Sequence, residues 1–267
     1  MSQRLQDRVA IVFGAGSSGP GWGNGKASAV AYAHAGARVV CVDMVEEAAA
    51  ETSDIIRGES GDAISVAADA TDNAAVSRVV NESIARYGRI DILHNNVGVV
   101  LHGGPTDLDE DQFRRNLDIN LGSVFRTAKA VLPHFIAQKR GAIVNISSLA
   151  AIRWTGYPYF AYYAAKAAVN QATVALALQY APHNVRANCI MPGMIDTPLI
   201  YKQIASQYAS SEEMVAARAA AVPLGRMGTA WDVANAAVFL ASDDAQFITG
   251  VALPVDGGQS CSVSLPR

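Results

Sequence analysis

Short apolar runs alternate with longer segments of helical periodicity along the whole chain, and this alternation limits the possible folds most. The runs are rich in β-branched residues and apolar on both faces, which is typical of parallel strands covered by helices. Seven runs are predicted as strands: Val9 to Phe13, Val39 to Asp43, Ala63 to Ala68, Ile90 to His94, Ala142 to Ser147, Val185 to Met191 and Val251 to Val255.

The segments between these runs fit helices. Residues 73–87 are an example, because their apolar side chains fall on one helical stripe and Asp72 or Asn73 can act as the N-cap. No internal repeat, linker or low-complexity stretch interrupts the alternation. The sequence therefore predicts an α/β fold: a single-domain, doubly wound Rossmann-type sheet of about seven parallel strands with helices on both faces. Ligands of such sheets bind beyond the carboxyl ends of the strands.

Composition narrows the class of partner. The 267 residues are 51% hydrophobic and 17% charged, which suits one domain with a large core. The net charge is -3, and the sequence has no run of Lys or Arg that would attract nucleic acid or an anionic membrane surface. We therefore expect a small-molecule substrate.

The spacing of the cysteines and histidines indicates a reducing compartment and no metal site. Cys41, Cys189 and Cys261 are far apart without a C-x-x-C motif, as expected of thiols in a reducing compartment, and the apolar N-terminal stretch is far shorter than the ~18 residues of a membrane span. A cytoplasmic protein is expected. The histidines are scattered without H-E-x-x-H, so no metal site is predicted, and no G-x-S-x-G elbow of a hydrolase occurs.

The stretch GAGSSGPGWGNGKA, residues 14–27, follows the first predicted strand. A helix over residues 25–35 with Asn24 as its N-cap leaves a loop from Gly14 to Gly23, whose backbone N–H groups and helix N-terminus suit a diphosphate. A mobile turn is the alternative. A P-loop is excluded, because Pro20 and Ala27 occupy positions where that motif needs Gly and Ser or Thr.

Asp43 ends the second predicted strand, where a carboxylate can accept both ribose hydroxyls of an adenosine. The same carboxylate would repel a 2'-phosphate, and no Arg or Lys adjoins it, so NAD is favoured over NADP. The alternative is an Asp that caps the helix starting near Glu46.

Tyr162 and Lys166 are four residues apart in YFAYYAAKAAVN, so a helix places them on one face. An ammonium beside the phenol favours phenolate and lowers the pKa of the tyrosine, which makes Tyr162 a usable base. Taken alone, such a pair is more often solvated.

Together with other motifs, this pair makes the sequence resemble the short-chain dehydrogenase/reductase family, in its single-domain branch with an enlarged glycine-rich loop, over essentially the whole chain. The matching segments are NNVG at 95–98, NLDINLG with Asn120, NISS with Ser148, Y-x-x-x-K at Tyr162 and Lys166, and MPGMIDTP at 191–198.

The resemblance implies catalytic roles for Asn120, Ser148, Tyr162 and Lys166. It implies that a nicotinamide cofactor is bound by Gly14, Gly23, Asn24, Gly25, Asp43, Asp69, Ala70, Asn96, Gly98, Tyr162, Lys166, Pro192, Gly193, Ile195 and Thr197. Residues 1–267 would form one NAD(P)-binding domain. The expected reaction interconverts a secondary alcohol and a ketone, with Tyr162 as general acid and base.

Two segments depart from the family pattern: the glycine loop is about five residues longer, and the stretch from Ser148 to Tyr162 is one residue longer. The candidate substrate pocket is formed by His102, Trp154, Tyr157, Met194 and Leu199, and residues 198–222 are a candidate lid. By analogy with the family, the chain should form a homotetramer or homodimer.

Two other functions stay open. Tyr159 has the spacing before Lys166 that enoyl-thioester reductases of related fold use. A non-catalytic NAD-binding sensor would share the fold without the chemistry, because fold alone does not establish function.

Overall fold

The computed structural model describes residues 3–262, apart from the side chain at position 206, and builds them around a parallel sheet. The sheet has seven strands in the order β3-β2-β1-β4-β5-β6-β9. Their bounds are β1 (Val9–Phe13), β2 (Arg38–Asp43), β3 (Ala63–Ala67), β4 (Ile92–Asn95), β5 (Gly141–Ile146), β6 (Val185–Pro192) and β9 (Ala252–Val255). The chain reverses direction across the sheet after β3, so β1 and β4 form the switch point at which such sheets bind ligands.

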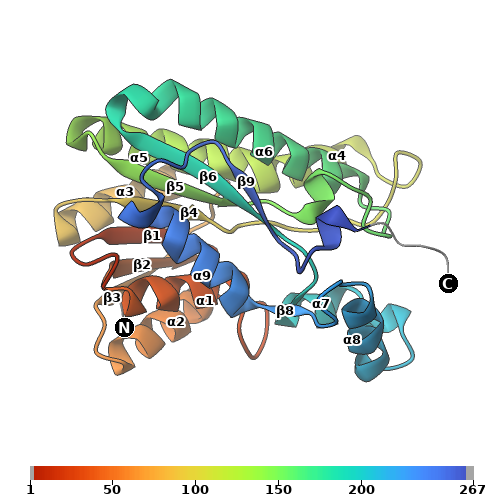
Figure 1. The fold of residues 1–267 in the computed structure, drawn as a ribbon. Coiled ribbons are helices and arrows are strands. Elements are labelled where there is room, and N and C mark those ends of the chain that lie inside the picture. Colours follow the sequence, from red (N-terminus) through yellow and green to blue (C-terminus); the bar gives the residue numbers. More distant parts are fainter. Residues whose placement is uncertain (1–2, 263–267) are drawn as a thin grey trace.

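Helices cover both faces of this sheet (Figure 1). On one face lie α1 (Asn24–His34), α2 (Glu46–Gly58) and α9 (Ala230–Ala241); on the other lie α3 (Asn73–Tyr87), α4 (Glu110–Leu117), α5 (Ser123–Gln138) and α6 (Phe160–Tyr180). Alternate residues of one strand point to opposite cores: Ala10 and Val12 join the first, whereas Ile11 and Phe13 join the second. Burial on both faces explains why the strands are continuous apolar runs.

A smaller element stands apart from the sheet at the lower right of Figure 1. It consists of the two-stranded pair β7 (Ile195–Asp196) and β8 (Gly228–Thr229), with α7 (Pro198–Gln203) and α8 (Ser211–Ala220) between them. We refer to residues 198–220 as the α7–α8 segment.

The predicted fold class is confirmed, and all seven predicted strands lie within two residues of the observed ones. The helix predicted at 73–87 is α3, and the Asp72 carboxylate accepts a hydrogen bond from the Ala74 N–H, so Asp72 is its N-cap. The predicted N-cap of the first helix is wrong. Gly23 takes the extended conformation of an N-cap (φ -79°, ψ 159°), and Asn24 is the first helical residue. The Asn24 side chain therefore does not cap the helix.

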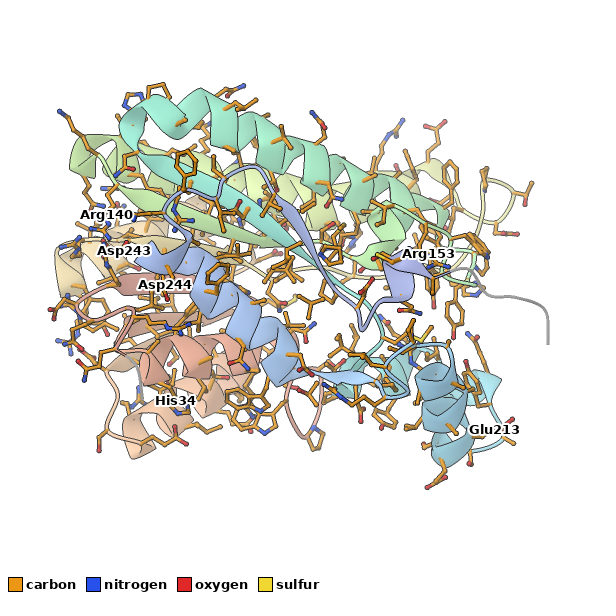
Figure 2. The ribbon with its side chains drawn as sticks, viewed as in Figure 1. His34, Arg140, Arg153, Glu213, Asp243 and Asp244 are labelled. Atoms are coloured by element: carbon orange, nitrogen blue, oxygen red, sulfur yellow. The ribbon has the colours of Figure 1, made fainter. Side chains whose placement is uncertain are left out.

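The two ends of the sheet differ in their side chains (Figure 2). At the amino ends of the strands, Arg8 and Arg140 both pair with Asp243, and Arg4 pairs with Asp244. Arg153 and Glu213 lie at the opposite end. Along residues 3–262, the helices are too short or too polar to cross a membrane.

Candidate functional site

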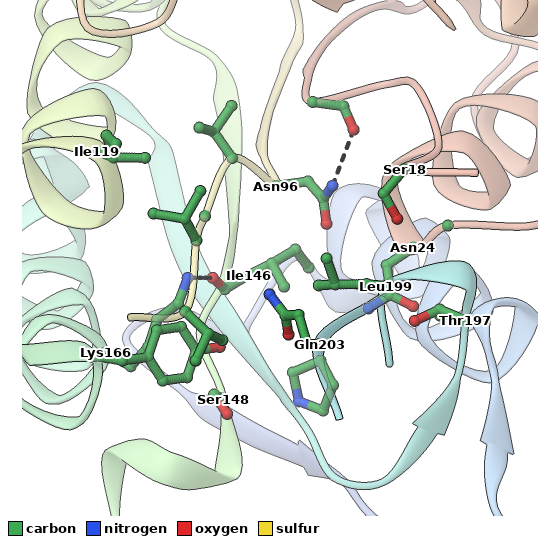
Figure 3. A pocket seen from close by; sticks show the side chains of 18 of the residues that line it. Ser18, Asn24, Asn96, Ile119, Ile146, Ser148, Lys166, Thr197, Leu199 and Gln203 are labelled. Carbon is green, nitrogen blue, oxygen red and sulfur yellow. Dashed lines mark hydrogen bonds between the residues drawn. The ribbon is translucent and has the colours of Figure 1, made fainter. Parts of the chain in front are cut away.

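One large cleft, of about 1250 Å³, opens at the carboxyl ends of the strands. Its walls come from the turns that follow β1 to β6 and from the α7–α8 segment. Figure 3 shows Ser148 and Lys166 on one side of it and Ser18, Asn24 and Thr197 on the other. The topology alone places a site here, because parallel strands present their carboxyl ends at one edge.

The glycine loop between β1 and α1 is fixed at both ends. The Gly16 N–H donates to Asp43 Oδ2 at 3.0 Å, while Asp43 Oδ1 accepts the Val45 N–H at 3.1 Å. At the other end, the Trp22 ring packs against Trp231 of α9, with the ring centroids 4.9 Å apart. Trp22 therefore anchors the loop to a helix that is distant in sequence.

The N-terminus of α1 is open to an anion. The helix has no side-chain cap and no acidic residue in its first turn, so its positive end is not neutralised. Its second residue is Gly25, where a Cβ would lie 1.8 Å from the Gly14 carbonyl oxygen, so only glycine permits this approach of helix and loop. Gly25 shapes the cleft without lining it, whereas Gly14, Gly23 and Asn24 line it.

Two buried polar atoms beside this helix end have no hydrogen-bond partner in residues 3–262: Ser17 Oγ and Asn24 Oδ1. Both residues line the cleft. Buried polar groups are normally satisfied, so these atoms indicate a polar ligand. The residues present fit the diphosphate of a dinucleotide.

The residues expected around the adenosine gather at the β2–β3–β4 side of the cleft. Asp69 accepts hydrogen bonds from the N–H and the hydroxyl of Thr71, both at 2.8 Å, and these hold the pKa of the Asp69 carboxyl below its usual value. Ala70 is buried beside it. Asn96 Nδ2 donates to the Gly14 carbonyl oxygen at 2.9 Å, a bond drawn in Figure 3 that joins the β4 and β1 turns.

Tyr162, Lys166 and Ser148 meet at the other end of the cleft. Helix α6 carries Tyr162 and Lys166 one turn apart, and Ser148 follows β5. Lys166 Nζ donates to the Ile146 carbonyl oxygen at 2.9 Å and lies 5.5 Å from the centre of the Tyr162 ring. The backbone of β5 thus orients the lysine toward the tyrosine.

The pKa of Tyr162 differs from the sequence-based expectation. Burial raises the pKa above its usual value, and a hydrogen bond with Ser148 lowers it by less. Burial also lowers the pKa of Lys166 to about 8. The expected lowering of the tyrosine pKa by Lys166 is wrong for this arrangement, because desolvation dominates and the ammonium lies over the ring while bonded to a carbonyl.

Asn120 lies behind the cleft wall, within a π-helical turn at Asp118–Gly122 that interrupts α4 and α5. Its Nδ2 donates to the Val99 carbonyl at 2.9 Å, and its Oδ1 accepts the Val99 N–H at 3.2 Å. Gly98 separates Asn120 from Lys166: a Cβ there would lie 2.9 Å from Asn120 Oδ1 and 3.0 Å from Lys166 Nζ. The π-turn is a local feature often found at functional sites, and nothing in the sequence pattern predicted it.

The segment that follows β6 completes the cleft, and the four residues expected near the nicotinamide line it: Pro192, Gly193, Ile195 and Thr197. The candidate pocket residues divide into two groups. Tyr157, Met194 and Leu199 line the cleft. His102 is exposed and packs edge-on against Tyr159, and Trp154 is 63% exposed and stacks on Tyr163, so neither reaches the cleft. Each packs on a tyrosine ring instead, His102 on Tyr159 and Trp154 on Tyr163.

Several cleft residues escaped the sequence analysis: Ser17, Ser18, Thr71, Lys202, Gln203, Arg218 and Gln259. Arg218 is the most unusual, since it is a buried cation in an alanine-rich helix. A single basic residue within VAARAA was the available signal. In the described part of the chain, His, Cys, Asp and Glu side chains form no group of three that could hold a metal ion.

A family profile, curated proteins and solved structures each match nearly the whole chain. A family profile described as enoyl-(acyl carrier protein) reductase matches residues 20–260. A 2,5-dichloro-2,5-cyclohexadiene-1,4-diol dehydrogenase from Sphingobium indicum is 34% identical over 270 residues, which cover 98% of this chain and 100% of that protein. A 3-oxoacyl-(acyl-carrier-protein) reductase from Chlamydia muridarum is 36% identical over 262 residues, covering 97% and 100%. A solved structure described as a short-chain dehydrogenase/reductase from Burkholderia xenovorans is 44% identical, covers 98% of this chain and 99% of that one, and superposes with a TM-score of 0.91.

Proposed function

Because the chain belongs to the short-chain dehydrogenase/reductase family, we propose that it is an NAD-dependent enzyme interconverting a secondary alcohol and a ketone. The observation that carries the proposal is the meeting of Tyr162, Lys166 and Ser148 in a cleft that also fits a dinucleotide. The family uses nicotinamide cofactors, and its curated members named above act on alcohols or ketones.

NAD rather than NADP is proposed from the adenosine end of the cleft. Asp43 already accepts two backbone N–H groups, and its carboxylate lines the cleft where a ribose would lie. Ser17, Asn24 and the open end of α1 would hold the diphosphate. A nicotinamide ring held near Thr197 and Ile195 supplies the hydride acceptor or donor.

The protein's own contribution is the handling of one proton and the orientation of the substrate oxygen. Ser148 donates a hydrogen bond to that oxygen. In oxidation the Tyr162 phenolate takes the alcohol proton, and in reduction the Tyr162 hydroxyl donates its proton to the ketone oxygen. Lys166, with its pKa near 8, is largely cationic at neutral pH, and its Nζ, 5.5 Å from the centre of the Tyr162 ring, would bind the ribose of the nicotinamide. Since burial raises the pKa of Tyr162, oxidation should accelerate as the pH rises toward that pKa.

The test is a screen of secondary alcohols with NAD and with NADP, in which the absorbance of the reduced cofactor reports turnover. With a substrate in hand, Tyr162→Phe should lower kcat by about 10²- to 10⁴-fold, the range of general acid–base catalysis, while calorimetry shows unchanged NAD binding. Tyr180→Phe, at the far end of α6, is the matched control. Near-normal turnover by Tyr162→Phe would reject the role of Tyr162. NAD binding without turnover of any alcohol or ketone would favour a sensor.

One observation favours a second candidate. Tyr159 also lines the cleft, six intervening residues before Lys166, and the matching profile is described as an enoyl reductase. Burial raises the pKa of Tyr159 to about 12, and its ring lies edge-on to Tyr162 at 6.4 Å. Supplying NADH with an enoyl thioester tests this reaction. Loss of its turnover in Tyr159→Phe but not in Tyr162→Phe would establish it over alcohol oxidation.

We also propose that the α7–α8 segment acts as a lid and that the chain forms a homodimer or homotetramer. Phe125 on α5 and Leu178 on α6 are 65% and 69% exposed, an apolar surface that suits packing of these helices against a second copy. Light scattering tests the assembly, and a monomer of 28.0 kDa would reject it.

A further inference from the structure

Arg218 is a buried cation whose charge no described residue neutralises. It lies in α8, is only 9% exposed and lines the cleft. Its Nε is buried without a hydrogen-bond partner in residues 3–262, and no ion pair to it occurs in that range. Burying a guanidinium without an acceptor is costly, so the position indicates a missing anionic partner.

The place of Arg218 in the cleft shows which ligand this partner would be. The pKa of Tyr159 and of Tyr208 is raised, by burial and by the hydrogen bond between Tyr208 and Tyr157, and the charge of Arg218 opposes this rise in both. The Tyr159 ring is itself in edge contact with Tyr162. Tyr159 thus neighbours both the charge of Arg218 and the proposed base. A group bound by Arg218 would belong to the substrate that reacts at Tyr162.

The carboxylates of the cleft lie elsewhere. Within the described residues, the acidic side chains that line it are Asp43, which ends β2, Asp69, which comes after β3, and Asp118, which follows α4. Asp118 is paired with Arg126. Among the described side chains, no carboxylate lines the cleft near Tyr157 and Tyr159. The Glu213 carboxylate also acts on Tyr208, but Glu213 is exposed, lies outside the cleft lining and accepts the Ala209 N–H.

We propose that Arg218 binds a carboxylate of the substrate, so that the natural substrate is a hydroxy acid or oxo acid. The inference rests on the proposed alcohol–ketone chemistry and adds its substrate class. A planar guanidinium matches a carboxylate through two parallel hydrogen bonds, and the low exposure of the site strengthens them. The tyrosine hydroxyls that link the 157 turn to the α7–α8 segment, Tyr157 and Tyr208, are 3.0 Å apart and close the same end.

The experiment compares each hydroxy acid of a panel, aliphatic and aromatic from four to eight carbons, with its methyl ester. The panel is measured with NAD on the wild type, Arg218→Met and Arg226→Met. Arg226 is the matched control, because it carries the same charge but is 58% exposed and lies outside the cleft. In Arg218→Met, kcat/KM should fall by about 10- to 100-fold for the acids and by less than about threefold for the esters, as expected for loss of a charge-assisted pair. Arg226→Met should change neither.

A purely structural role of Arg218 would lower kcat/KM for acid and ester equally, and that result would overturn the proposal. A wild-type preference for the esters would overturn it as well. Preference for sulfonate or phosphate analogues over the carboxylates would retain Arg218 as an anion receptor but reject the carboxylate.

Binding separates this inference from the proposed reaction. Calorimetry with the corresponding oxo acids and NADH should give heats for the wild type that are lost in Arg218→Met, even if the chemistry is not alcohol oxidation. Equal binding to both proteins would overturn the proposal. Absence of turnover for every alcohol, with selective binding intact, would reject the proposed function alone.

Discussion

The floor of the cleft, which carries the proposed catalytic residues, and the α7–α8 segment form two sides of one cleft but are built differently. The floor, formed by β5, the turn at 118–122 and the start of α6, is packed: Asn120 and Lys166 are 0% and 3% exposed, and their polar atoms bond to backbone groups. The segment opposite has no buried residue in α7 and only two in α8, Met214 and Arg218.

This difference separates two tasks. Proton transfer needs groups held within a fraction of an ångström, which a core-facing strand and a long helix provide. Substrate selection tolerates a weakly packed element that can open and close, and few buried contacts make local opening inexpensive in free energy. The proposed reacting groups lie on the rigid side, and Arg218 lies on the other.

The largest effect is expected from Gly98→Ala, because this substitution changes the packing between Asn120 and Lys166 in the floor of the cleft. The new Cβ would lie 2.9 Å from Asn120 Oδ1 and 3.0 Å from Lys166 Nζ, so one of them must move. We expect kcat to fall by about 100-fold, as for a misplaced catalytic group, with unfolding changed little. Gly104→Ala is the control, since its Cβ would meet Asp107 at 3.5 Å outside the cleft. Unchanged kcat in Gly98→Ala would show that the floor is less rigid than its packing indicates.

An intermediate effect concerns the packing beneath the floor at β4. His94 is fully buried, and burial lowers its pKa to about 3. The unfolded chain binds a proton near pH 6.5 while the folded protein does not, so stability is present above that pH and is lost as the pH falls from 6.5 toward 3. Between pH 7 and pH 5 the loss should be about 2 kcal/mol.

Urea unfolding at both pH values measures this loss. His94→Asn should remove the acid slope, whereas Tyr32→Phe, which deletes the hydroxyl 2.9 Å from His94 Nδ1 but keeps the imidazole, should retain it. An equal slope in wild type and His94→Asn would assign acid sensitivity to other groups.

The smallest effect belongs to the α7–α8 segment. Ser210 caps α8 by accepting the Glu213 N–H at 3.2 Å, and Ser210→Ala should cost about 1 kcal/mol in this helix. We expect amide exchange in α8 to accelerate about fivefold and KM to rise, while kcat and global unfolding stay unchanged. Ser77→Ala, at an exposed position of α3, is the control. Coupled loss of kcat would mean that the segment and the floor form one cooperative unit.

Particular residues show where sequence reasoning succeeded. The seven strands and the 73–87 helix follow from periodicity, which backbone geometry imposes locally. Tyr162 and Lys166 could be paired because four residues are one helical turn. Asn24 was misplaced as a cap by one residue, since local preference favours Asn over Gly as an N-cap, whereas Gly23 takes that position in the structure.

The remaining features depend on neighbours distant in the chain. Trp22 meets Trp231, and Arg218 acts on Tyr159, contacts that no local pattern contains. His102 and Trp154 turn away from the cleft because Tyr159 and Tyr163 offer them aromatic surfaces.

The amino-acid sequence by itself determined the order of strands and helices and the residues that stand at the strand ends, because hydrophobic periods and helical spacing act over a few residues. Only the tertiary structure decided the protonation tendencies of Tyr162, Lys166 and His94, and the isolation of Arg218. Those properties arise from desolvation and from charges brought close by folding, and their strength depends on which distant segments exclude water from each group.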